Sequence, residues 1–435
     1  MLRLYSLAWY LAMPLVLLRL WWRGRKEVGY RQHLAERLGW YRAVKPSPGV
    51  PVAPLIWVHA VSVGETRAAE PLIQALLLRY PSHHILLSHM TPTGRATGQA
   101  LFGDAIARLR LQQCYLPYDT GWLVSRFLRQ FKPRICILME TEVWPNLIAQ
   151  CVRLRVPVAL VNARLSARSL SKAERFSKLL LPAARAITCV AAQTDADAER
   201  VRQLGAAQVH VTGSIKFDVT PAAAVLAQGA ALRTAIGQRP VLLCANTRDG
   251  EEALILDALS QLSVANALLI LVPRHPQRFN AVAKMIEARG LALCRRSALG
   301  EDLTTANATL APQVQVLLGD SMGEMFAYYS ACDLAFVGGS LLPLGGHNLI
   351  EACALGKPVL LGPHTFNFGV ISEEAVAAGA ALRVADADAI MLHASQLLTM
   401  TERRHVIGAA AQAFALQHRG ACGRTLDLLQ PLLKD

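Results

Sequence analysis

The sequence predicts an α/β protein made of two doubly wound, Rossmann-like domains that face each other across a cleft. Short, wholly apolar runs alternate with helical patterns in the first half of the chain, as in a parallel sheet covered on both faces. The same alternation returns in the second half, after a break that contains Gly213 and Pro221. With 435 residues, the chain is also too long for one ordinary core.

Each apolar run predicts a strand, and the periodic segments between the runs predict helices. In the first half, strands are expected at residues 55–58, 84–88, 135–139, 156–161, 187–192 and 208–212, and helices at 68–79 and 195–203. In the second half, strands are expected at 241–245, 267–272, 315–318, 334–337 and 358–361, and helices at 250–262 and 279–289. The linker is expected near 213–222. This organisation predicts an anchor and basic collar over 1–26, one domain over 27–212 and a second over 213–435, whose last helix packs back on the first domain.

Composition narrows the class of protein. Apolar residues make up 53% of the chain and charged residues 17%, which excludes a disordered protein. A formal charge of +14 predicts an anionic partner, namely nucleic acid, an acidic substrate or a membrane surface. Nucleic acid is the least favoured, because the sequence has no zinc-finger spacing and no basic helix with interleaved aromatics. The 9 cysteines form no CxxC pair and are expected to be buried thiols.

The N-terminus predicts attachment to a membrane. Residues 4–18 carry no charge, and Arg19, Arg23, Arg25 and Lys26 follow them. Fifteen helical residues rise about 22 Å, against a hydrocarbon core of about 30 Å. A signal anchor is preferred, and shallow monotopic insertion is the alternative. The charge excess after the apolar segment places the body in the cytoplasm. Further cations extend the collar toward anionic lipid: Arg31, Arg37 and Arg42.

A glycine-rich turn predicts a site for a phosphorylated ligand. The segment Gly345-Gly346-His347-Asn348-Leu349-Ile350-Glu351 lies between two expected strands and reads as a turn that opens a helix. Backbone N–H groups at such a turn bind anions. Glu351 would then contact a ribose hydroxyl, so a nucleotide is the ligand expected here.

Acidic residues follow two expected strands of the first half. Gly64 precedes Glu65 just after the strand at 55–58, so Glu65 is a candidate general base for an alcohol. The alternative is that Glu65 only stabilises the start of a helix near Thr66. Glu140 and Glu142 follow the strand at 135–139. One is expected to function and the other to form an ion pair with an arginine of the loop at 162–168, without a local reason to say which.

Cations and a helix start complete the candidate set. Lys216 lies at the domain crossover, and Arg274 with His275 follows the strand at 267–272. Each could bind a phosphate or carboxylate, or could be an ordinary surface residue. Ser321 and Glu324 predict a capping box, and the backbone of residues 322–324 could contact a base. No metal site is expected, since HExxH and cysteine quartets are absent from the sequence and the two DxD pairs do not follow strands.

Together these segments resemble the Kdo (3-deoxy-D-manno-octulosonic acid) transferases of lipopolysaccharide biosynthesis. The matching motifs occur in order along nearly the whole chain, at residues 61–65, 90–94, 139–146, 162–166, 213–218, 273–275 and 345–348. The resemblance implies a glycosyltransferase type B fold and an inverting transfer of Kdo from CMP-Kdo onto lipid IVA, a lipid A precursor, without a cofactor or metal. It also implies an N-terminal acceptor-binding domain, a C-terminal CMP-sugar-binding domain and a place at the inner membrane.

The resemblance also implies roles for individual residues. Glu65 matches the proton acceptor, and Glu140 and Lys216 match residues that stabilise the transition state. The CMP-binding segments correspond to Arg274, His275, Met322, Gly323, Glu324, Asn348, Leu349, Ile350 and Glu351. Arg248 stands where the family pattern has a histidine. This arginine would add a positive charge for the phosphate or carboxylate of the donor. Two alternatives are a membrane-associated transferase that uses a UDP-sugar and a non-catalytic protein that binds anionic lipid.

Overall fold

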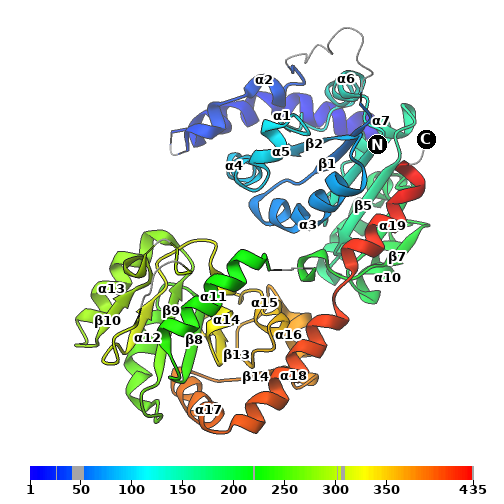
Figure 1. Ribbon diagram of the computed structural model, residues 1–435. Helices are drawn as coiled ribbons and strands as arrows, with labels where there is room; N and C mark the ends of the chain where they lie inside the picture. Colours follow the sequence, from blue (N-terminus) through cyan, green and yellow to red (C-terminus); the bar gives the residue numbers. More distant parts are fainter. Residues whose placement is uncertain (26, 42–52, 219–220, 301, 305–308, 434–435) are drawn as a thin grey trace. The chain divides into compact units, whose positions relative to one another are not determined.

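In the computed structural model, the chain folds into two compact α/β units, which are described here one at a time (Figure 1). Unit 1 comprises Met1–Asp218 and Arg419–Asp435, and unit 2 comprises Val219–His418. The structure describes all residues except 26, 42–52, 219–220, 301, 305–308 and 434–435. Two predicted members of the basic collar, Lys26 and Arg42, and part of the predicted linker therefore lie outside the described residues.

Unit 1 is built on a 7-stranded, wholly parallel sheet with the strand order β3-β2-β1-β4-β5-β6-β7. Its strands are β1 (Leu55–His59), β2 (His84–His89), β3 (Leu111–Tyr115), β4 (Ile135–Met139), β5 (Val158–Ala163), β6 (Cys189–Ala192) and β7 (Val209–Val211). Its helices are α1 (Leu2–Arg23), η1 (Val28–Arg31), α2 (Leu34–Arg37), α3 (Val63–Arg79), α4 (Pro92–Leu101), α5 (Gly103–Ala107), α6 (Gly121–Phe131), α7 (Pro145–Arg153), α8 (Ala167–Arg175), α9 (Ser177–Arg185), α10 (Asp195–Gln203), η2 (Ile215–Phe217) and α19 (Ala421–Leu433).

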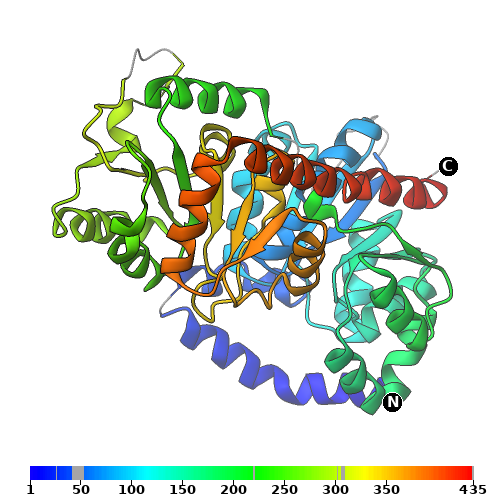
Figure 2. The ribbon, with the colours of Figure 1, turned by 90° about the horizontal axis from the view of Figure 1, so that it is seen from below.

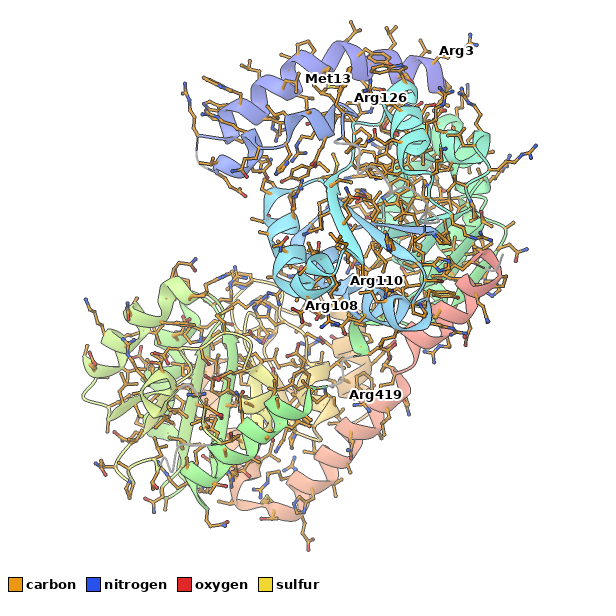
Figure 3. The ribbon with its side chains drawn as sticks, turned by 45° about the horizontal axis from the view of Figure 1, so that its top comes forward. Arg3, Met13, Arg108, Arg110, Arg126 and Arg419 are labelled. Carbon is orange, nitrogen blue, oxygen red and sulfur yellow. The ribbon has the colours of Figure 1, made fainter. Side chains whose placement is uncertain are left out.

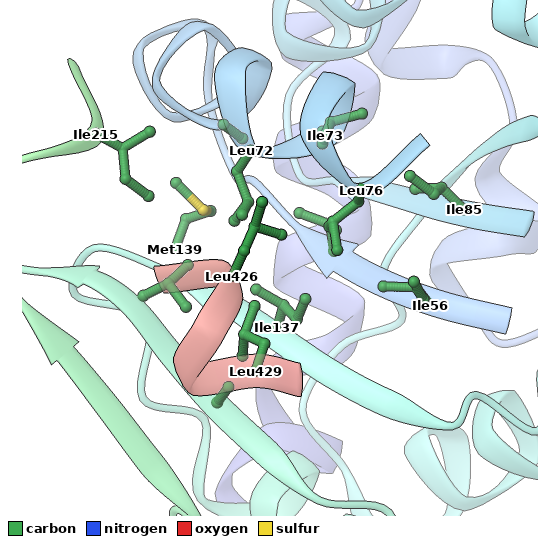
Figure 4. Close-up of a cluster of buried hydrophobic side chains, with 14 of the residues drawn as sticks. Ile56, Leu72, Ile73, Leu76, Ile85, Ile137, Met139, Ile215, Leu426 and Leu429 are labelled. Atoms are coloured by element: carbon green, nitrogen blue, oxygen red, sulfur yellow. The ribbon is translucent and has the colours of Figure 1, made fainter. Parts of the chain in front are cut away.

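Both faces of this sheet are covered, which explains why β4 is apolar at every position and β1 at every position except His59. Ile56 and Ile137 face one core and Trp57 and Leu138 face the other. The last helix, α19, belongs to the first of these cores, where Leu426 and its neighbours pack against β1, β4 and α3 (Figure 4). The C-terminal segment is therefore part of unit 1, although it follows unit 2 in the chain.

Unit 2 has a second 7-stranded parallel sheet, in the order β10-β11-β9-β8-β12-β13-β14. Its strands are β8 (Val241–Thr247), β9 (Leu268–Pro273), β10 (Leu293–Arg295), β11 (Val316–Leu318), β12 (Leu334–Val337), β13 (Val359–Leu361) and β14 (Ala381–Arg383). Its helices are α11 (Ala223–Ile236), α12 (Glu251–Ala258), η3 (Leu259–Gln261), η4 (Pro276–Arg278), α13 (Phe279–Glu287), η5 (Arg296–Leu299), α14 (Met325–Ala331), α15 (Ile350–Ala354), α16 (Gly369–Ala377), α17 (Ala387–Thr399) and α18 (Thr401–Gln417).

The predicted α/β class is confirmed, and the missed strands share one cause. β3, β10 and β14 each lie at an edge of a sheet, where one side has no neighbouring strand. They are short or carry polar residues, such as the two glutamines of β3, so they lack the apolar run of a central strand. The helix expected from residue 250 to 262 ends at Ala258 and continues as the short η3.

Two further corrections concern segments near the candidate site. Asn162 and Ala163 were expected in a loop but complete β5, where the pairing with β6 shifts register. Residues 213–218 were assigned to the second domain but belong to unit 1, because hydrogen bonds tie them to β5 and α19. The backbone N–H of Ile215 donates to the Asn162 side chain, and Asp218 accepts from the N–H groups of Gly420 and Cys422.

Helix α1 lies along the outside of unit 1 (Figures 1 and 2). Near its start, the Ser6 hydroxyl donates to Asn146 Oδ1 over 3.0 Å. Farther along, the Trp9 ring packs on Tyr118 with 5.5 Å between centroids, and Met13, labelled in Figure 3, belongs to the same apolar cluster as Leu20. One face of α1 therefore packs on the protein along most of the helix.

Candidate active site

The candidate residues of unit 1 collect at the carboxyl edge of its sheet. β1 pairs with β2 on one side and with β4 on the other, so the strand order changes direction between β1 and β4. In open α/β sheets, ligands bind outside the carboxyl ends of the strands at this kind of switch point. The loop after β1 leads to Glu65, and the residue directly after β4 is Glu140.

Glu65 lies in the first turn of α3, which begins at Val63 rather than near Thr66. Ser62 is the N-cap, and its hydroxyl accepts a hydrogen bond from the Glu65 N–H. In return, Glu65 Oε2 accepts from the Val61 N–H over 2.7 Å. The carboxylate therefore has the helix-capping contact that was the alternative to a catalytic role, and this contact also fixes its position.

The surroundings of Glu65 raise the pKa of its carboxyl from 4.5 to about 7. Burial is the main cause, because it penalises the charged form. The hydrogen bond from Val61 works in the opposite direction, while the charges of Glu142 and Glu140 raise the pKa further. A carboxylate with a pKa near the working pH is suited to take a proton from an alcohol.

This pKa predicts a pH dependence of the reaction. If the ionised form of Glu65 is the base, kcat/KM should rise about tenfold per pH unit below pH 7 and level off above it. The expected profile therefore has an inflection near pH 7 rather than near the ordinary 4.5 of a glutamate. Initial rates measured from pH 5 to 9 with saturating donor check this, and a profile that is flat between pH 5 and 7 would contradict it.

Glu140 is held in an unusual backbone conformation. Its φ is 55°, in the left-handed region that few residues other than glycine adopt. Its N–H donates to the Val161 carbonyl over 3.0 Å, which pins it to the neighbouring strand. From there its carboxylate reaches Lys216 Nζ, 2.6 Å away, in an ion pair that is partly open to solvent.

The second acid of this loop is held differently. Glu142 Oε2 accepts a hydrogen bond from the indole N–H of Trp144 over 2.7 Å, and burial raises the pKa of its carboxyl. The expectation of an ion pair with Arg164 or Arg168 is wrong for both acids within the described part of the chain, where the salt bridge of Glu140 is to Lys216. The loop after β4 therefore carries two carboxylates. One forms an ion pair with a lysine, and the other accepts a hydrogen bond from a tryptophan.

Asn162 positions Lys216. Its φ is 54°, and its side-chain oxygen accepts from the N–H of Ile215 over 3.1 Å and from the Ser214 hydroxyl over 3.4 Å. These bonds hold η2 beside β5 and so direct the next side chain, Lys216, at Glu140. The sequence contains a signal for this role, because asparagine is one of the few residues that tolerates a left-handed backbone.

In unit 2, positive charge collects at the carboxyl ends of three adjacent strands. Arg248 follows β8, Arg274 and His275 follow β9, and His347 lies in the loop after β12. Burial, Arg274 and Arg248 together lower the pKa of His347 to about 4. The pKa of His275 is also lowered, by desolvation and by the nearby arginines. Both imidazoles are thus neutral near pH 7, among guanidinium groups that favour an anion.

The glycine-rich turn has the conformation that its sequence predicts. Gly345 and Gly346 have φ values of 94° and 75°, which a larger residue adopts only with strain. A Cβ on Gly345 would also lie 2.1 Å from the Asn367 side chain. After the turn, Asn348 Oδ1 accepts from the Ile350 N–H over 3.1 Å, and α15 begins with Glu351 in its first turn. Asn348 therefore forms a turn just before α15, whose N-cap residue is Leu349.

The side chain of Glu251 holds the loops after β8 and β12 together. Its buried carboxylate accepts hydrogen bonds from the backbone N–H groups of Arg248 over 2.8 Å, Gly339 over 2.7 Å and Leu341 over 2.9 Å. The loops after β8 and β12 are thereby tied to one acid at the start of α12. A charge-assisted bond of this kind contributes about 1.5–3 kcal/mol, so the loops are firmly held.

The segment after β11 differs from its prediction. Ser321 does not cap a helix, because α14 begins only at Met325. The Ser321 hydroxyl instead donates to the Glu324 carboxylate over 2.5 Å, and Arg296 pairs with Glu324 over 2.7 Å. Gly323 has a φ of 83°, and the Met322 side chain is 57% exposed. The turn 321–324 is thus fixed by side-chain contacts and leaves Met322 accessible.

Comparison with known proteins decides the family. A family model described as 3-deoxy-D-manno-octulosonic-acid transferase (kdotransferase) matches residues 32–219, and one described as glycosyl transferases group 1 matches residues 301–414. The 3-deoxy-D-manno-octulosonic acid transferase of Bordetella pertussis is 48% identical over 435 residues, 99% of each chain. The chain belongs to the Kdo transferase family. The 3-deoxy-D-manno-octulosonic acid transferase of Haemophilus influenzae is also similar, with 39% identity over 98% of this chain and 97% of its own length.

As a Kdo transferase, the protein is a glycosyltransferase, and the resemblance seen in its motifs is confirmed. Among solved structures, UDP-GlcNAc 2-epimerase from Neisseria meningitidis bound to UDP-GlcNAc covers 87% of this chain and 100% of that one. Its TM-score is 0.56 with 17% identity, so it supports the type B glycosyltransferase class of fold alone. Among the described residues of the Kdo transferase, no cluster of 3 or more side chains could hold a metal ion.

Several residues that shape the Kdo transferase site were not singled out from the sequence. Trp144 caps Glu142, and its ring lies 6.1 Å from that of the buried His59. Asn162 directs Lys216, and Glu251 holds the loops after β8 and β12. Each acts through hydrogen bonds or ring contacts with segments distant in sequence. The pattern of residues along the chain does not reveal such contacts.

Proposed function

We propose that this Kdo transferase moves Kdo from CMP-Kdo onto lipid IVA, a phosphorylated and acylated lipid, at the cytoplasmic face of the inner membrane. The observation that carries this proposal is Glu65, a partly buried carboxyl with a pKa of about 7 beside the Glu140–Lys216 pair at the switch point of unit 1. A transferase that activates a sugar hydroxyl needs a base of this kind. Membership of the family supplies the identity of the transferred sugar.

Unit 2 supplies the site for the donor. Kdo is an acid and CMP carries a phosphate, so the donor brings two negative groups. The cations at the ends of β8 and β9, Arg248 and Arg274, suit such a ligand, and the neutral imidazoles of His275 and His347 add hydrogen-bonding groups. The turn with Met322, Gly323 and Glu324, and the segment from Asn348 through Leu349 and Ile350 to Glu351, would hold the nucleoside.

The reaction then balances without a metal. Glu65 takes the proton of the acceptor hydroxyl, and the oxygen attacks the anomeric carbon of Kdo. The bond from that carbon to the CMP phosphate oxygen breaks, so CMP leaves with the electron pair. Attack opposite the leaving group inverts the anomeric centre. Lys216, aligned by Glu140, and the arginines of unit 2 stabilise the developing negative charge.

The exposed face of α1 would hold the enzyme at the membrane. Among the described helices, α1 is the one with the length and composition of a membrane span. Its packed face nevertheless lies on unit 1, while an apolar stripe at helical spacing remains more than half exposed: Leu4, Leu7, Leu11, Leu15, Leu18 and Trp22. A helix with one face on the body and the other apolar suits insertion parallel to the membrane surface. We therefore favour monotopic insertion over the spanning anchor preferred from the sequence.

One member of the predicted basic collar is corrected by the structure. Arg37 is 1% exposed, donates to the Met90 carbonyl and lies 3.9 Å from the centre of the Tyr115 ring. It holds the fold together and is not available to a lipid headgroup. Arg19 and Arg25 remain exposed beside the apolar stripe, where they could meet anionic lipid.

Removing the apolar character of α1 should release the enzyme from membranes. Leu11 and Leu15 are 72% and 69% exposed, so Leu11→Glu with Leu15→Glu should leave the fold intact. Each lost leucine removes about 1.5–3 kcal/mol of burial, enough to lower vesicle binding at least about 100-fold. Sedimentation with anionic vesicles measures this. The matched control replaces exposed leucines of unit 2, Leu392→Glu with Leu416→Glu. Unchanged sedimentation of the α1 variant would contradict the role of the stripe.

The nucleotide preference tests the proposed donor. CMP should raise the melting temperature of the purified protein, because binding to the folded state stabilises it. UDP should have a much smaller effect at the same concentration. A larger shift with UDP would support the alternative of a UDP-sugar donor, and no shift with either nucleotide would support a non-catalytic lipid-binding protein.

A further inference from the structure

A groove between the N-terminus and two helices of unit 1 is not used by the mechanism above. It has a volume of about 260 Å³, and its walls come from α1, α7 and α9. Figure 1 shows the N-terminus beside α7. Apart from Lys178, the lining side chains are apolar: Met1, Leu2, Pro145, Ile148, Ala149, Leu179, Pro182, Ala183 and Ala186. This volume is below the usual range for a whole ligand of drug size. Together with the apolar lining, it suits part of a hydrocarbon chain rather than a sugar.

The groove is continuous with two features already described. Its wall starts at Pro145, the first residue of α7, and the loop just before it carries Glu140, Glu142 and Trp144. At the other end, Met1 and Leu2 lead into the exposed apolar stripe of α1. The Ser6–Asn146 hydrogen bond holds α1 against α7 at this point. The groove therefore connects the surface proposed to enter the membrane with the loop of catalytic acids.

The neighbouring helix α8 carries a concentration of positive charge. Between residues 164 and 178 there is one acid, Glu174, against five exposed cations: Arg164, Arg168, Lys172, Arg175 and Lys178. Arg168, Lys172 and Arg175 are spaced by four and three residues, so they share one helix face. The side chains of these cations have no ion pair within the part of the chain that the structure describes. Like charges at this spacing destabilise an isolated helix, so an anionic ligand would relieve a cost.

The cations also lie next to the catalytic acids in the sheet. β5 is the neighbour of β4, and Arg164, the first residue after β5, donates its backbone N–H to the Glu140 carbonyl over 3.4 Å. α8 begins three residues later, at Ala167. A ligand whose phosphates contact α8 would thus have its sugar near the carboxyl edge of the sheet, where Glu65 and Glu140 lie.

We propose that α8 and the groove between α1, α7 and α9 form the acceptor subsite, in which the cations bind a phosphate and the groove holds one acyl chain of the acceptor lipid. This inference rests on the proposed function and identifies which surface recognises each chemical part of the acceptor. The cations take the role that the sequence gave to the basic collar. Lys178, at the rim of the groove, marks the boundary between the polar and apolar parts.

Two sets of variants separate the two parts of the acceptor. Arg168→Glu with Lys172→Glu should raise KM at least about tenfold for any phosphorylated acceptor, acylated or not, and leave KM for CMP-Kdo unchanged. Ala149→Phe, which fills the groove, should raise KM for the acylated acceptor but not for the same phosphorylated sugar after deacylation. Ala186→Leu is a milder filling variant in case Ala149→Phe does not fold, and melting temperatures verify the fold of each.

The matched control for charge is Arg108→Glu with Arg153→Glu. These exposed arginines precede β3 and end α7, at the amino edge of the same sheet, so KM should not change. Assays use the full chain in detergent with mass-spectrometric detection. If the wild type forms no Kdo lipid, the proposed function itself fails. If the wild type is active and the α8 and groove variants keep its KM values, or if α8 reversal weakens only binding to anionic vesicles, the acceptor subsite is wrong.

Discussion

Replacing Glu65 by glutamine is expected to lower the rate of Kdo transfer about 10²–10⁴-fold, the usual contribution of a general base. Glutamine keeps the shape and can still accept the hydrogen bond from the Val61 N–H, so α3 should start as before. CMP binding should not change, because the residues proposed to bind the donor belong to unit 2. Single-turnover rates and CMP-induced melting shifts measure the two effects on the same samples.

The stability of the Glu65→Gln protein tests the raised pKa of Glu65 independently of activity. Folding raises the pKa of Glu65, so the folded protein loses stability as pH increases from about 4.5 to about 7. Glutamine has no charge to desolvate, so at pH 8 its melting temperature should equal or exceed that of the wild type. The matched control is Glu70→Gln on the same helix, which should keep full activity. A Glu65→Gln protein that turns over at a near-normal rate would show that another group is the base.

Replacing Lys216 by methionine is expected to lower kcat about 10²–10³-fold, as when one group that stabilises transition-state charge is removed. Methionine keeps the apolar stem but removes the charge 2.6 Å from Glu140. Lys216→Arg should lose less, because it keeps a cation, although its planar fork cannot reproduce a point charge. The pair is partly open to solvent, so the melting temperature should fall only slightly.

A double substitution tests whether Lys216 and Glu140 act together. If Glu140 only aligns the lysine, Glu140→Gln added to Lys216→Met should cost little beyond the single change. Additive losses would instead show that each contributes separately. Lys284→Met, at an exposed position of α13, serves as the matched control for loss of a lysine charge. Full kcat in the Lys216→Met enzyme would remove this residue from the mechanism.

The positions of the central strands and the place of the candidate site at their carboxyl ends could be predicted because central parallel strands have a characteristic apolar pattern. Runs such as Ile135–Met139 are apolar at every position because helices cover both faces of the sheet. The acids and cations right after such runs then necessarily lie at one edge. This reasoning is sufficient to place Glu65, Glu140 and Arg274, because each of them lies in the segment that directly follows a predicted strand.

Other features depend on contacts that the sequence does not display. The pairing of Glu140 with Lys216 rather than with Arg164 depends on Asn162, whose side chain holds the segment that precedes Lys216 beside β5.

 That side chain accepts hydrogen bonds from Ser214 and Ile215, and the resulting position of η2 decides where Lys216 points. The burial of Arg37 is similar, since its partners Met90 and Tyr115 come from distant segments.

The orientation of α1 was also beyond prediction from the sequence. Composition gives the length and apolar character of a helix, but not whether one face has a partner in the protein. The contacts of Ser6 with Asn146 and of Trp9 with Tyr118 provide that partner. An apolar helix that could span a bilayer therefore becomes, in the structure, a helix with one packed face and one exposed face.

The most direct test of the account is mass spectrometry of the lipid after incubation of the purified enzyme with CMP-Kdo and lipid IVA. We expect a Kdo adduct of the lipid with the wild type and with Glu70→Gln, and almost none with Glu65→Gln at equal protein concentration. An adduct that forms equally well with Glu65→Gln, or that forms from a UDP-sugar and not from CMP-Kdo, would contradict the account.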